Sequence, residues 1–445
     1  MERQFKYSGN PIIGNIPEDW QLKRLKDVGY LYGGLTGKAG DDFDVDEERD
    51  NYAFYIPFTN IFNNTYISPS VLGKVKVSAG ETQNEVHKGD LLFLMSSEDF
   101  DGIGKPSVID FEQTNLYLNS FCKGFRITAN ISPKFLNYLM SSNVERELIR
   151  LEAKGFIRIN LRQDKLACCN IIVPSRIEQD RIADYLDEKC GEIDSLIGLQ
   201  EQMIEKLKAY KQSVITEAVT KGLNPNAKLV PSGIDWIGEI PEGWRITVLR
   251  RFANIILGKM LQPNIKSEED SLEQYICAKD VHFEGIDTSD LKKMYFNKVE
   301  RELYQVQKGD MLVVEGGAGA AGSCVLKTDL PETYIQNSIM IVRPKQGIDI
   351  RYIQYFEFSL VKKGYVDYVC NKATIPHFTK DKLSSMPIPL PSLSEQQTIA
   401  SYLDCKCSEI DKLIDVKQKK IERLKDYKKS VIYEAVTGKT DLRDN

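Results

Sequence analysis

Two long stretches of the chain carry apolar residues at intervals of three and four, with charged residues between them. In residues 178–220 the apolar positions follow i, i+3, i+4 and i+7 spacing, and residues 395–437 repeat them. Neither stretch contains proline, and glycine lies just beyond each C-terminal end, as is common where a helix stops. The pattern predicts two helices of roughly 40 residues, each spanning roughly 60 Å.

Each predicted helix has an apolar stripe that must be covered, and part of the stripe follows a seven-residue, coiled-coil-like repeat. The other helix is the natural partner, because both carry the same stripe; packing of each helix on its neighbouring domain is the alternative. The stripe also includes Leu196 and Tyr210 with their counterparts Leu413 and Tyr427. The positions expected to pack are Ile193, Ile197, Ile204, Leu207, Val214, Ile410, Ile414, Ile421, Leu424 and Val431.

The chain is an internal duplication. The motif Ile16-Pro17-Glu18-x-Trp20 recurs 224 residues later, and Lys88-Gly89-Asp90 recurs 220 residues later. The two helical stretches align without a gap and are identical at 27 of 43 positions. Three blocks in the same order indicate two homologous halves, roughly 8–222 and 232–437.

The segments inside this duplicated frame look different from the helices and from each other. Short apolar runs predict strands, and amphipathic stretches predict shorter helices, so each insert is expected to be a mixed α and β domain. Residues 26–153 and 250–370 share little beyond the Lys-Gly-Asp block. Either each insert recognises something different, or the two have drifted apart. The expected strands are Leu91–Met95, Met311–Val314 and Ile339–Val342, and the expected helices are Asn137–Leu151 and Tyr352–Val361.

The composition narrows the function classes. Of 445 residues, 42% are hydrophobic, which is ample for packed domains, and 59 Lys and Arg against 64 Asp and Glu give a net charge of −5. A strongly basic, non-specific nucleic-acid binder is therefore disfavoured, whereas local basic patches are compatible with this balance. The N-terminal residues lack an apolar signal segment and no 18-residue apolar run occurs, so a cytoplasmic protein without membrane contact is expected.

No convincing catalytic or metal site emerges from the motifs. Gly317-x-Gly319-x-x-Gly322 resembles a dinucleotide-binding turn, but strand-like residues follow it where a helix is required, so a hairpin tip is expected. The nine cysteines form no C-x-x-C pair, and the three histidines are isolated in the sequence. We expect reduced thiols and neither a metal nor a cofactor in this chain.

A short segment at the same place in both halves is locally basic. In residues 154–165 four cations accompany one acid, and the matched residues 371–382 carry three lysines and one acid. Cations interleaved with amide and aromatic residues suit contact with DNA phosphates, while a solvated loop is the alternative. The candidate DNA-binding residues are Lys154, Arg158, Asn160, Arg162, Lys165, Asn371, Lys372, Thr379, Lys380 and Lys382.

Reading a base sequence also requires polar side chains that reach the groove edges. Candidates lie in the turn-rich stretches of both inserts, where Asn, Gln, Ser and Lys cluster. The candidate base-reading residues fall in four such stretches: Thr59, Asn60, Asn63 and Asn64; Ser96, Ser97 and Lys105; Gln262, Asn264 and Lys266; and Gln336, Asn337 and Ser338.

The duplicated motifs resemble those of one known family. Ile16-Pro17-x-x-Trp20, Lys88-Gly89-Asp90 and Glu178-Gln179-x-x-Ile182-Ala183, each with its copy in the second half, resemble the specificity subunit of type I restriction–modification enzymes. The helix endings, Ser-Val-Ile-x-Glu-Ala-Val-Thr in both copies, fit the same family. The resemblance covers nearly the whole chain in family order.

The resemblance implies an α+β fold: two homologous mixed α/β target-recognition domains separated by two long antiparallel coiled-coil-like helices, an internal pseudo-two-fold repeat. Each domain would read one half of a bipartite double-stranded DNA target, and the helices would set the gap between the halves. The expected boundaries are 1–176 for the first recognition domain, 177–222 for the central helix, 223–393 for the second recognition domain and 394–440 for the C-terminal helix.

The resemblance also implies a non-catalytic subunit that binds two methyltransferase (modification) subunits, docked on the helices, and two restriction subunits. S-adenosylmethionine, ATP and Mg would then belong to those partners. Two other interpretations are a coiled-coil scaffold that binds proteins without reading DNA, and a nucleotide-dependent enzyme. The scaffold does not explain the duplicated basic segments, and the enzyme depends on one glycine motif that the first half lacks.

Overall fold

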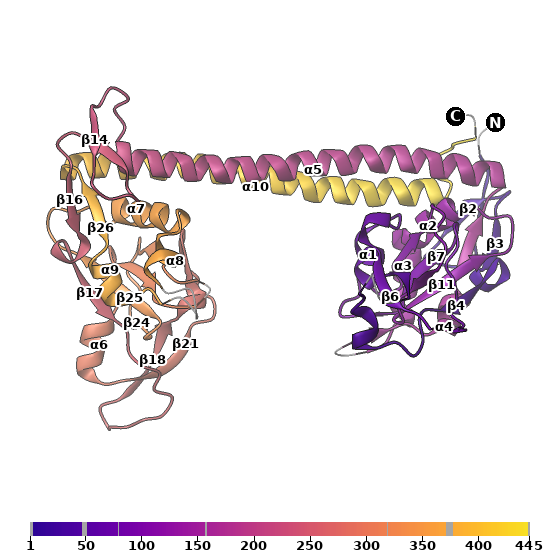
Figure 1. The fold of residues 1–445 in the computed structure, drawn as a ribbon, viewed down its shortest axis with the longest axis horizontal. Coiled ribbons are helices and arrows are strands. Elements are labelled where there is room, and N and C mark those ends of the chain that lie inside the picture. The colour runs from indigo at the N-terminus through magenta and orange to yellow at the C-terminus, as the bar shows by residue number, and fades with distance from the viewer. Residues whose placement is uncertain are drawn as a thin grey trace. The chain divides into compact units, whose positions relative to one another are not determined.

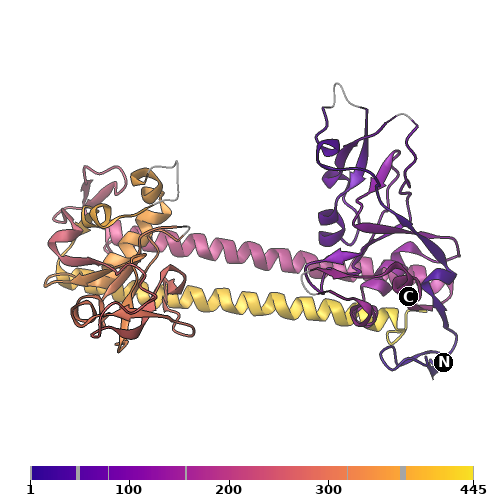
Figure 2. The same cartoon turned by 90° about the horizontal axis from the view of Figure 1, so that it is seen from below.

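The computed structural model describes residues 3–46, 51–78, 80–155, 158–317, 319–370 and 377–443. The chain divides into two compact units. The first consists of Met1–Gln200 and Lys419–Asn445, and the second of Glu201–Gln418. Each unit therefore contains one mixed α/β domain together with part of both long helices (Figures 1 and 2).

The first unit is built on a four-stranded sheet of order β4-β11-β7-β9 and a three-stranded sheet of order β10-β5-β6. Strand β7 (Leu91–Leu94) is buried along its whole length, because it has sheet neighbours on both sides and core on both faces. The other elements are β1 (Phe5–Tyr7), β2 (Asn15–Pro17), β3 (Gln21–Arg24), β4 (Gly29–Gly33), β5 (Tyr52–Ile56), α1 (Phe58–Asn63), β6 (Gly73–Lys76), β8 (Ser96–Ser97), β9 (Pro106–Val108), β10 (Leu116–Leu118), β11 (Cys122–Ile127), α2 (Pro133–Ser141), α3 (Asn143–Glu152), β12 (Ile159–Asn160), α4 (Gln163–Ala167) and β13 (Asn170–Val173).

The second unit repeats this topology with sheets of order β17-β25-β22-β23 and β21-β18-β24. The duplication seen in the sequence frame therefore extends to the diverged inserts. The elements are β14 (Leu229–Pro231), β15 (Glu239–Pro241), β16 (Arg245–Val248), β17 (Ala253–Leu257), β18 (Ser271–Ile276), β19 (Val281–His282), β20 (Gly285–Ile286), β21 (Lys292–Phe296), α6 (Lys298–Tyr304), β22 (Met311–Val314), β23 (Ser323–Val325), β24 (Thr333–Ile335), β25 (Ile339–Pro344), α7 (Ile350–Lys362), α8 (Tyr365–Val369), α9 (Lys380–Ser384) and β26 (Pro387–Leu390).

The elements expected from the sequence occur close to their predicted positions, with one error. The single helix expected over Asn137–Leu151 is instead α2 and α3, separated at Ser142. Ser142 is extended (φ −65°, ψ 152°) and buried, and it is the N-cap residue of α3, so a second helix starts here although the apolar pattern continues. The glycine motif forms the tip between the antiparallel strands β22 and β23, as a hairpin requires.

The two long helices are α5 (Arg176–Lys221, 46 residues) and α10 (Leu393–Val436, 44 residues). In the second unit Lys211 Nζ of α5 lies 2.7 Å from Asp411 of α10. The sequence-equivalent pair occurs in the first unit, where Lys428 Nζ of α10 lies 2.7 Å from Asp194 of α5. The helices therefore run antiparallel within each unit, with the same ion pair marking the register in both.

The apolar stripe of the helices is narrower than its sequence pattern indicates. Of the ten positions expected to pack, five are buried and five are partly buried. Four further stripe positions are instead exposed: Leu196 (42%), Tyr210 (54%), Leu413 (50%) and Tyr427 (59%). They form two equivalent pairs, so the same apolar side chains remain uncovered in both copies. The buried positions are Ile193, Ile204, Ile410, Ile421 and Val431, and the partly buried ones are Ile197, Leu207, Val214, Ile414 and Leu424.

The Ile-Pro-x-x-Trp motif anchors the start of each long helix. Trp20 is fully buried, and its Nε1–H donates to Glu178 at the first turn of α5 (3.0 Å). In the second unit Trp244 donates in the same way to Glu395 of α10 (3.3 Å). A carboxylate is favoured at a helix N-terminus by the helix dipole and here also accepts a buried donor.

The glutamine that follows each of these glutamates fastens the recognition domain to the helix. Gln179 accepts from the backbone N–H of Ser132 (2.8 Å) and donates to the carbonyl of Pro174 (2.9 Å). Gln396 repeats both bonds, accepting from the N–H of Asp349 (2.9 Å) and donating to Pro391 (3.0 Å). The Glu-Gln pair therefore has a structural role in both copies.

The Lys-Gly-Asp motif is a turn whose buried aspartate is held by an arginine, while its lysine is exposed. Asp90 accepts from Arg126 Nη2 (2.7 Å) and from the N–H of His87 (2.9 Å), and this partnership raises the pKa of Arg126. Asp310 accepts in the same way from the equivalent Arg343 (2.7 Å). The glycine has a positive φ in both turns, +89° and +87°, which explains why it separates the lysine from the aspartate.

Each long helix ends on a glycine in the left-handed region, Gly222 (φ +75°) and Gly438 (φ +73°). A side chain at Gly222 would lie 3.3 Å from Trp244 and 3.5 Å from Glu395, whereas one at Gly438 would clash with the ring of Pro17. We predict that Gly222→Ala lowers the free energy of unfolding by about 1–2 kcal/mol, the cost of left-handed backbone. Gly438→Ala should cost about 1–3 kcal/mol more, because of the added overpacking.

Calorimetric unfolding of the two variants beside the parent chain measures this difference. Each variant serves as the control for the other, because both carry the same backbone penalty. Equal losses at the two positions would contradict the packing of the C-terminal helix end against Pro17.

Candidate nucleic-acid interface

Three segments that are distant in the sequence meet at one place in the first unit. Strand β8 pairs antiparallel with β12, so that Ser96 lies opposite Asn160. This pairing joins the turn after β7 to the basic segment. The loop before β11 is the third segment, because Met95 N–H donates to the carbonyl of Phe121 (3.4 Å). Two of the regions selected from the sequence are therefore neighbours in the fold.

A cavity of about 490 Å³ opens where these segments meet. Its walls combine aromatic rings with polar groups, and it includes the predicted residues Ser96, Ser97 and Arg158. The guanidinium of Arg158 lies 5.2 Å from the ring centroid of Phe121. Beside the cavity wall, Lys105 Nζ lies 5.1 Å from the centroid of Phe62 and donates to its carbonyl. Aromatic faces with cations above them suit stacking and phosphate contact.

The cations of the first basic segment differ in their surroundings. Arg162 is held by Asp164 (2.9 Å) and Lys165 by Glu152 (2.7 Å), which offsets part of their charge. Lys154 and Arg158 are exposed. These two are therefore the better candidates for contact with phosphate.

Lys105 lies in a different setting from the surface cations. Burial lowers the pKa of Lys105, and the nearby Arg146 and Lys428 lower it further. Its ammonium already has the Phe62 carbonyl as a partner, so part of its role is to hold α1 against the sheet.

The same three segments meet in the second unit. Gly316, after β22, forms an antiparallel bridge with His377, the equivalent of Asn160. Phe378 N–H donates to Glu315 (2.6 Å), and Glu315 N–H donates to Ser338 (2.8 Å) in the loop before β25. Asn337 adjoins this cluster through Ser338. The convergence is therefore a property of the fold, although the loop sequences differ.

The second basic segment is described in part. Lys382 Nζ donates to the carbonyl of His377 (2.8 Å), Lys380 begins α9 with an exposed side chain, and Thr379 is its N-cap residue. Asn371 and Lys372, also predicted to contact DNA, lie outside the described residues.

Some of the residues predicted to read bases are buried inside the protein. Asn60 (0% exposed) donates to the Ser68 carbonyl, Gln262 (7%) to Asp270, and Ser97 (5%) bonds to Asp99. Ser96 remains the more accessible member of its pair. The sequence reasoning missed the aromatic wall of Phe62 and Phe121, because only the fold shows that these rings adjoin the basic segment.

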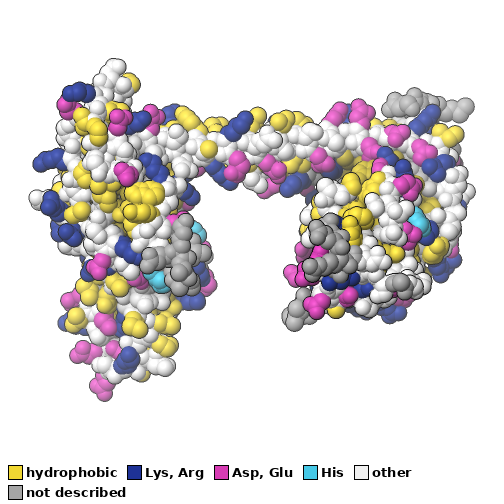
Figure 3. Space-filling model, viewed as in Figure 1, with side chains coloured by type: hydrophobic (Ala, Val, Ile, Leu, Met, Phe, Trp, Pro, Cys, Tyr) yellow, Lys and Arg dark blue, Asp and Glu magenta, His cyan; other side chains and the backbone are white. Residues whose placement is uncertain are grey.

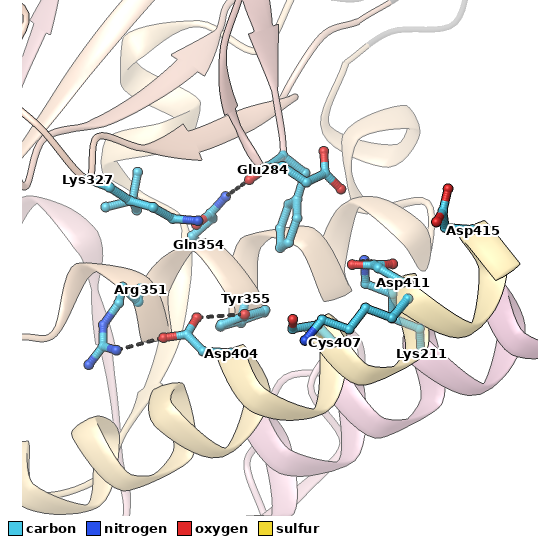
Figure 4. Close-up of a pocket in the computed structure, with 14 residues that line it drawn as sticks. Lys211, Glu284, Lys327, Arg351, Gln354, Tyr355, Asp404, Cys407, Asp411 and Asp415 are labelled. Carbon is cyan, nitrogen blue, oxygen red and sulfur yellow. Dashed lines mark hydrogen bonds and ion pairs between the residues drawn. The ribbon is translucent and has the colours of Figure 1, made fainter.

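A second cavity, of about 850 Å³, lies in the second unit between α7 and the two long helices (Figure 4). Two ion pairs lie in its wall, Lys211 with Asp411 and Arg351 with Asp404 of α10, and Asp404 accepts from Arg351 (2.7 Å) and from Tyr355 (2.9 Å). The equivalent Asp187 of α5 accepts from Lys134 (2.9 Å), Tyr138 (2.7 Å) and Tyr66. We interpret this aspartate in both units as a link between long helix and recognition domain.

Charged side chains are spread over the surface of both units. On the face shown in Figure 3, basic and acidic side chains are interspersed over both units. Within the described parts of the chain, no group of three or more His, Cys, Asp or Glu is placed to hold a metal ion. The helices among those residues include none that is long and apolar enough to span a membrane.

Comparison with known proteins identifies the duplicated frame. A sequence model of the type I restriction modification DNA specificity domain matches residues 17–209 and again residues 241–426. The chain belongs to this family. Each match covers one recognition domain and most of the helix that follows it, so the family unit is the repeat deduced from the sequence.

Relatives and solved structures agree with this membership. The MjaVIII specificity subunit of Methanocaldococcus jannaschii is 25% identical over 96% of this chain and 95% of its own length. The EcoKI specificity subunit of Escherichia coli is 22% identical over 96% and 90%. The fold resembles the HsdS subunit from Thermoanaerobacter tengcongensis (TM-score 0.52, 17% identity, 96% and 98% covered). It also resembles a chain from a study of type I R-M complex assembly and conformational transition (TM-score 0.71, 16% identity, 96% and 99% covered).

Family membership confirms the prediction of a type I DNA specificity subunit with no catalytic role of its own. It also removes the nucleotide-dependent enzyme, whose glycine motif is a hairpin tip in the structure. The individual DNA-contacting residues remain predictions, because neither the family match nor the fold assigns bases to side chains.

Arg158 offers a direct test of the interface. We predict that Arg158→Gln weakens binding to all DNA sequences and reduces the slope of log affinity against log salt by about one, as expected for one lost phosphate contact. Arg24→Gln is the matched control. Arg24 is exposed at the end of β3, outside the three segments, and forms an ion pair with Asp27. Fluorescence anisotropy at several salt concentrations measures both slopes. Equal slopes for the two variants would remove Arg158 from the interface.

Proposed function

We propose that this chain is the DNA-reading subunit of a type I restriction–modification complex and that each domain reads one half of a bipartite double-stranded target. The observation that carries this proposal is the meeting of the same three segments in both units. Their positions in the fold are shared, while their sequences differ. We call the place where the three segments meet the platform of each domain. A platform that is common to both domains but carries different loops is what two readers of different half-sites require.

The residues at the two platforms suit DNA. Exposed Lys154 and Arg158 can contact phosphates, which fix the position of a protein on the duplex without selecting a sequence. Ser96, Asn160 and Asn337 offer the hydroxyl and amide groups that read base edges. A protein-only scaffold accounts for the helices but not for this pairing of cations with amides at equivalent sites.

The long helices would set the gap between the half-sites. Each continues from one unit into the other without a break, and 46 residues of α5 correspond to roughly 69 Å. The repeated Lys–Asp ion pairs show that each helix uses the same register against the other. A stiff antiparallel pair with internal two-fold character suits two half-sites at a fixed spacing.

The uncovered apolar side chains of the helices are our candidates for binding the methyltransferase partners. Leu196 and Tyr210 on α5 have the equivalents Leu413 and Tyr427 on α10, and all four are exposed. Two copies of one surface fit two methyltransferase subunits, with two restriction subunits completing the complex. In this proposal S-adenosylmethionine, ATP and Mg are bound by those partners, and the complex acts on DNA in the cytoplasm.

Mapping of methylated adenine tests the function as a whole. The chain would be co-expressed with the methyltransferase encoded beside it, and the host DNA read by single-molecule sequencing. We expect one split motif, methylated on both strands. A continuous motif would contradict one domain per half-site, and a stable complex that methylates nothing would favour the protein-only scaffold.

The spacer role predicts a change of gap when the helices change length. Removing one heptad from both helices, residues 199–205 and 416–422, shortens the pair by about 10 Å, or about three base pairs, and keeps the apolar faces in phase. We expect the split motif to keep its two halves and lose about three base pairs of gap. Removal from α5 alone is the control and should disturb helix pairing instead. An unchanged gap in the double deletion would contradict the spacer role.

A further inference from the structure

The turn after β17 in the second recognition domain has its polar residues inside and its apolar residues outside. Lys259 and Gln262 are each only 7% exposed, whereas Met260 and Leu261 between them are 75% and 56% exposed. Burying an apolar side chain stabilises the fold, whereas burying a polar one costs free energy unless it has a hydrogen-bond partner. This inverted order therefore calls for an explanation.

Specific contacts hold the turn in this orientation. The ammonium of Lys259 pairs with Glu300 and lies 5.2 Å from the ring centroid of Phe296. The side-chain amide of Gln262 donates to Asp270 (2.8 Å), and the backbone carbonyl of Gln262 accepts from the N–H of Tyr295 (3.0 Å). Both neighbours of the apolar pair are thus fixed to the domain, and the pair is presented on a rigid base.

The apolar pair lies beside the candidate interface. Lys259 forms a parallel bridge with Gln336, and its carbonyl accepts from the N–H of Asn337 (2.8 Å). The chain crosses here at Gly258, where any side chain would clash with the carbonyl of Gln336. The turn is therefore attached to the loop of Asn337 and Ser338, one of the three segments that meet at the platform.

The equivalent turn of the first domain lacks the pair. Gly34 makes the same close crossing, against the carbonyl of Asn119. The residue after it, Leu35, is buried (3% exposed), and the next, Thr36, is polar and exposed. At this turn the exposed apolar pair is therefore a feature of the second domain, and the equivalent turn of the first domain serves as an internal comparison.

We propose that Met260 and Leu261 form a wedge that enters the stack of base pairs in the half-site read by the second domain. Apolar side chains on a firmly held turn are used by DNA-bending proteins to unstack a base step. The neighbouring Asn264, Lys266 and Asn337 supply amide and cationic groups for the adjacent bases and phosphates. The DNA that fits is a half-site with a pyrimidine–purine step such as TA or CA, because these steps unstack most easily. The inference rests on the proposed function of the chain.

The test uses the complex of this chain with its methyltransferase subunits and a duplex carrying the mapped target. Single 2-aminopurines, which fluoresce when unstacked, replace purines in turn, except at the two methylated adenines and their neighbours. We expect fluorescence to rise at one step in one half of the target and to stay unchanged in the other half. The double variant Met260→Ser, Leu261→Ser should abolish the rise and weaken binding about tenfold, as loss of one specific base contact does.

Val299→Ser is the matched control, because Val299 is equally exposed (71%) on the adjacent α6. It should leave both fluorescence and affinity unchanged. DNA binding without any rise, or a rise that persists in the double variant, would overturn the wedge and leave the proposed function intact. Loss of the methyltransferase subunits from the double variant, with the DNA distortion preserved, would instead assign the pair to a protein contact. A complex that binds no DNA would overturn the proposed function and the wedge together.

Discussion

The hydrogen bond between a tryptophan N–H and a glutamate at the first turn of each long helix is the constraint on which the frame depends. In the first unit Glu178 receives both Trp20 and Arg3, the latter at 2.6 Å. Because the glycine that ends the other helix packs on the same tryptophan, one cluster fixes the beginning of one helix and the end of the other. The second unit repeats this arrangement around Trp244 and Glu395.

This frame leaves the recognition domains free to vary. The Gln179 and Asp187 side chains, with their equivalents on α10, bind the domains through backbone groups or through side chains close to the helix. The loops at the platform take no part in those bonds. Differences between Ser96–Ser97 and Gly316–Gly317 can therefore change which groups of the target are contacted. They do not change how the domain is attached to the long helix, so specificity can vary while the architecture stays the same.

Much of the frame could be predicted from the sequence, because it depends on local and repeated signals. The periodicity of residues 178–220 and 395–437 gave both long helices, and the recurring motifs gave the duplication. The break at Ser142 was missed although a local signal marks it: serine is a favoured residue just before a helix, and Ser142-x-x-Glu145 has the spacing of a capping box at the start of α3. The exposure of Leu196 and Tyr210, by contrast, does not follow from an apolar stripe that is continuous in sequence, because burial depends on which distant segments cover the stripe.

The candidate interface was predictable only in its polar part. The charge pattern selected the basic segment from Lys154 to Lys165, and the turn composition selected Ser96 and Asn337. In the fold these residues lie in or beside the converging segments. Phe121 and Met260 carry no sequence signal that distinguishes them from core residues, because their position depends on long-range strand pairing.

The discontinuous first unit has a consequence for synthesis on the ribosome. Its core includes Val431, Ile432, Ala435, Val436 and Leu442, whereas the second unit uses one uninterrupted stretch, Glu201–Gln418. The first unit therefore cannot complete its core until the C-terminal residues have been synthesised. The second unit can finish folding while the first still exposes apolar surface. A chain released early would keep that surface open to chaperones and proteases, so only a fully translated subunit would present two finished domains.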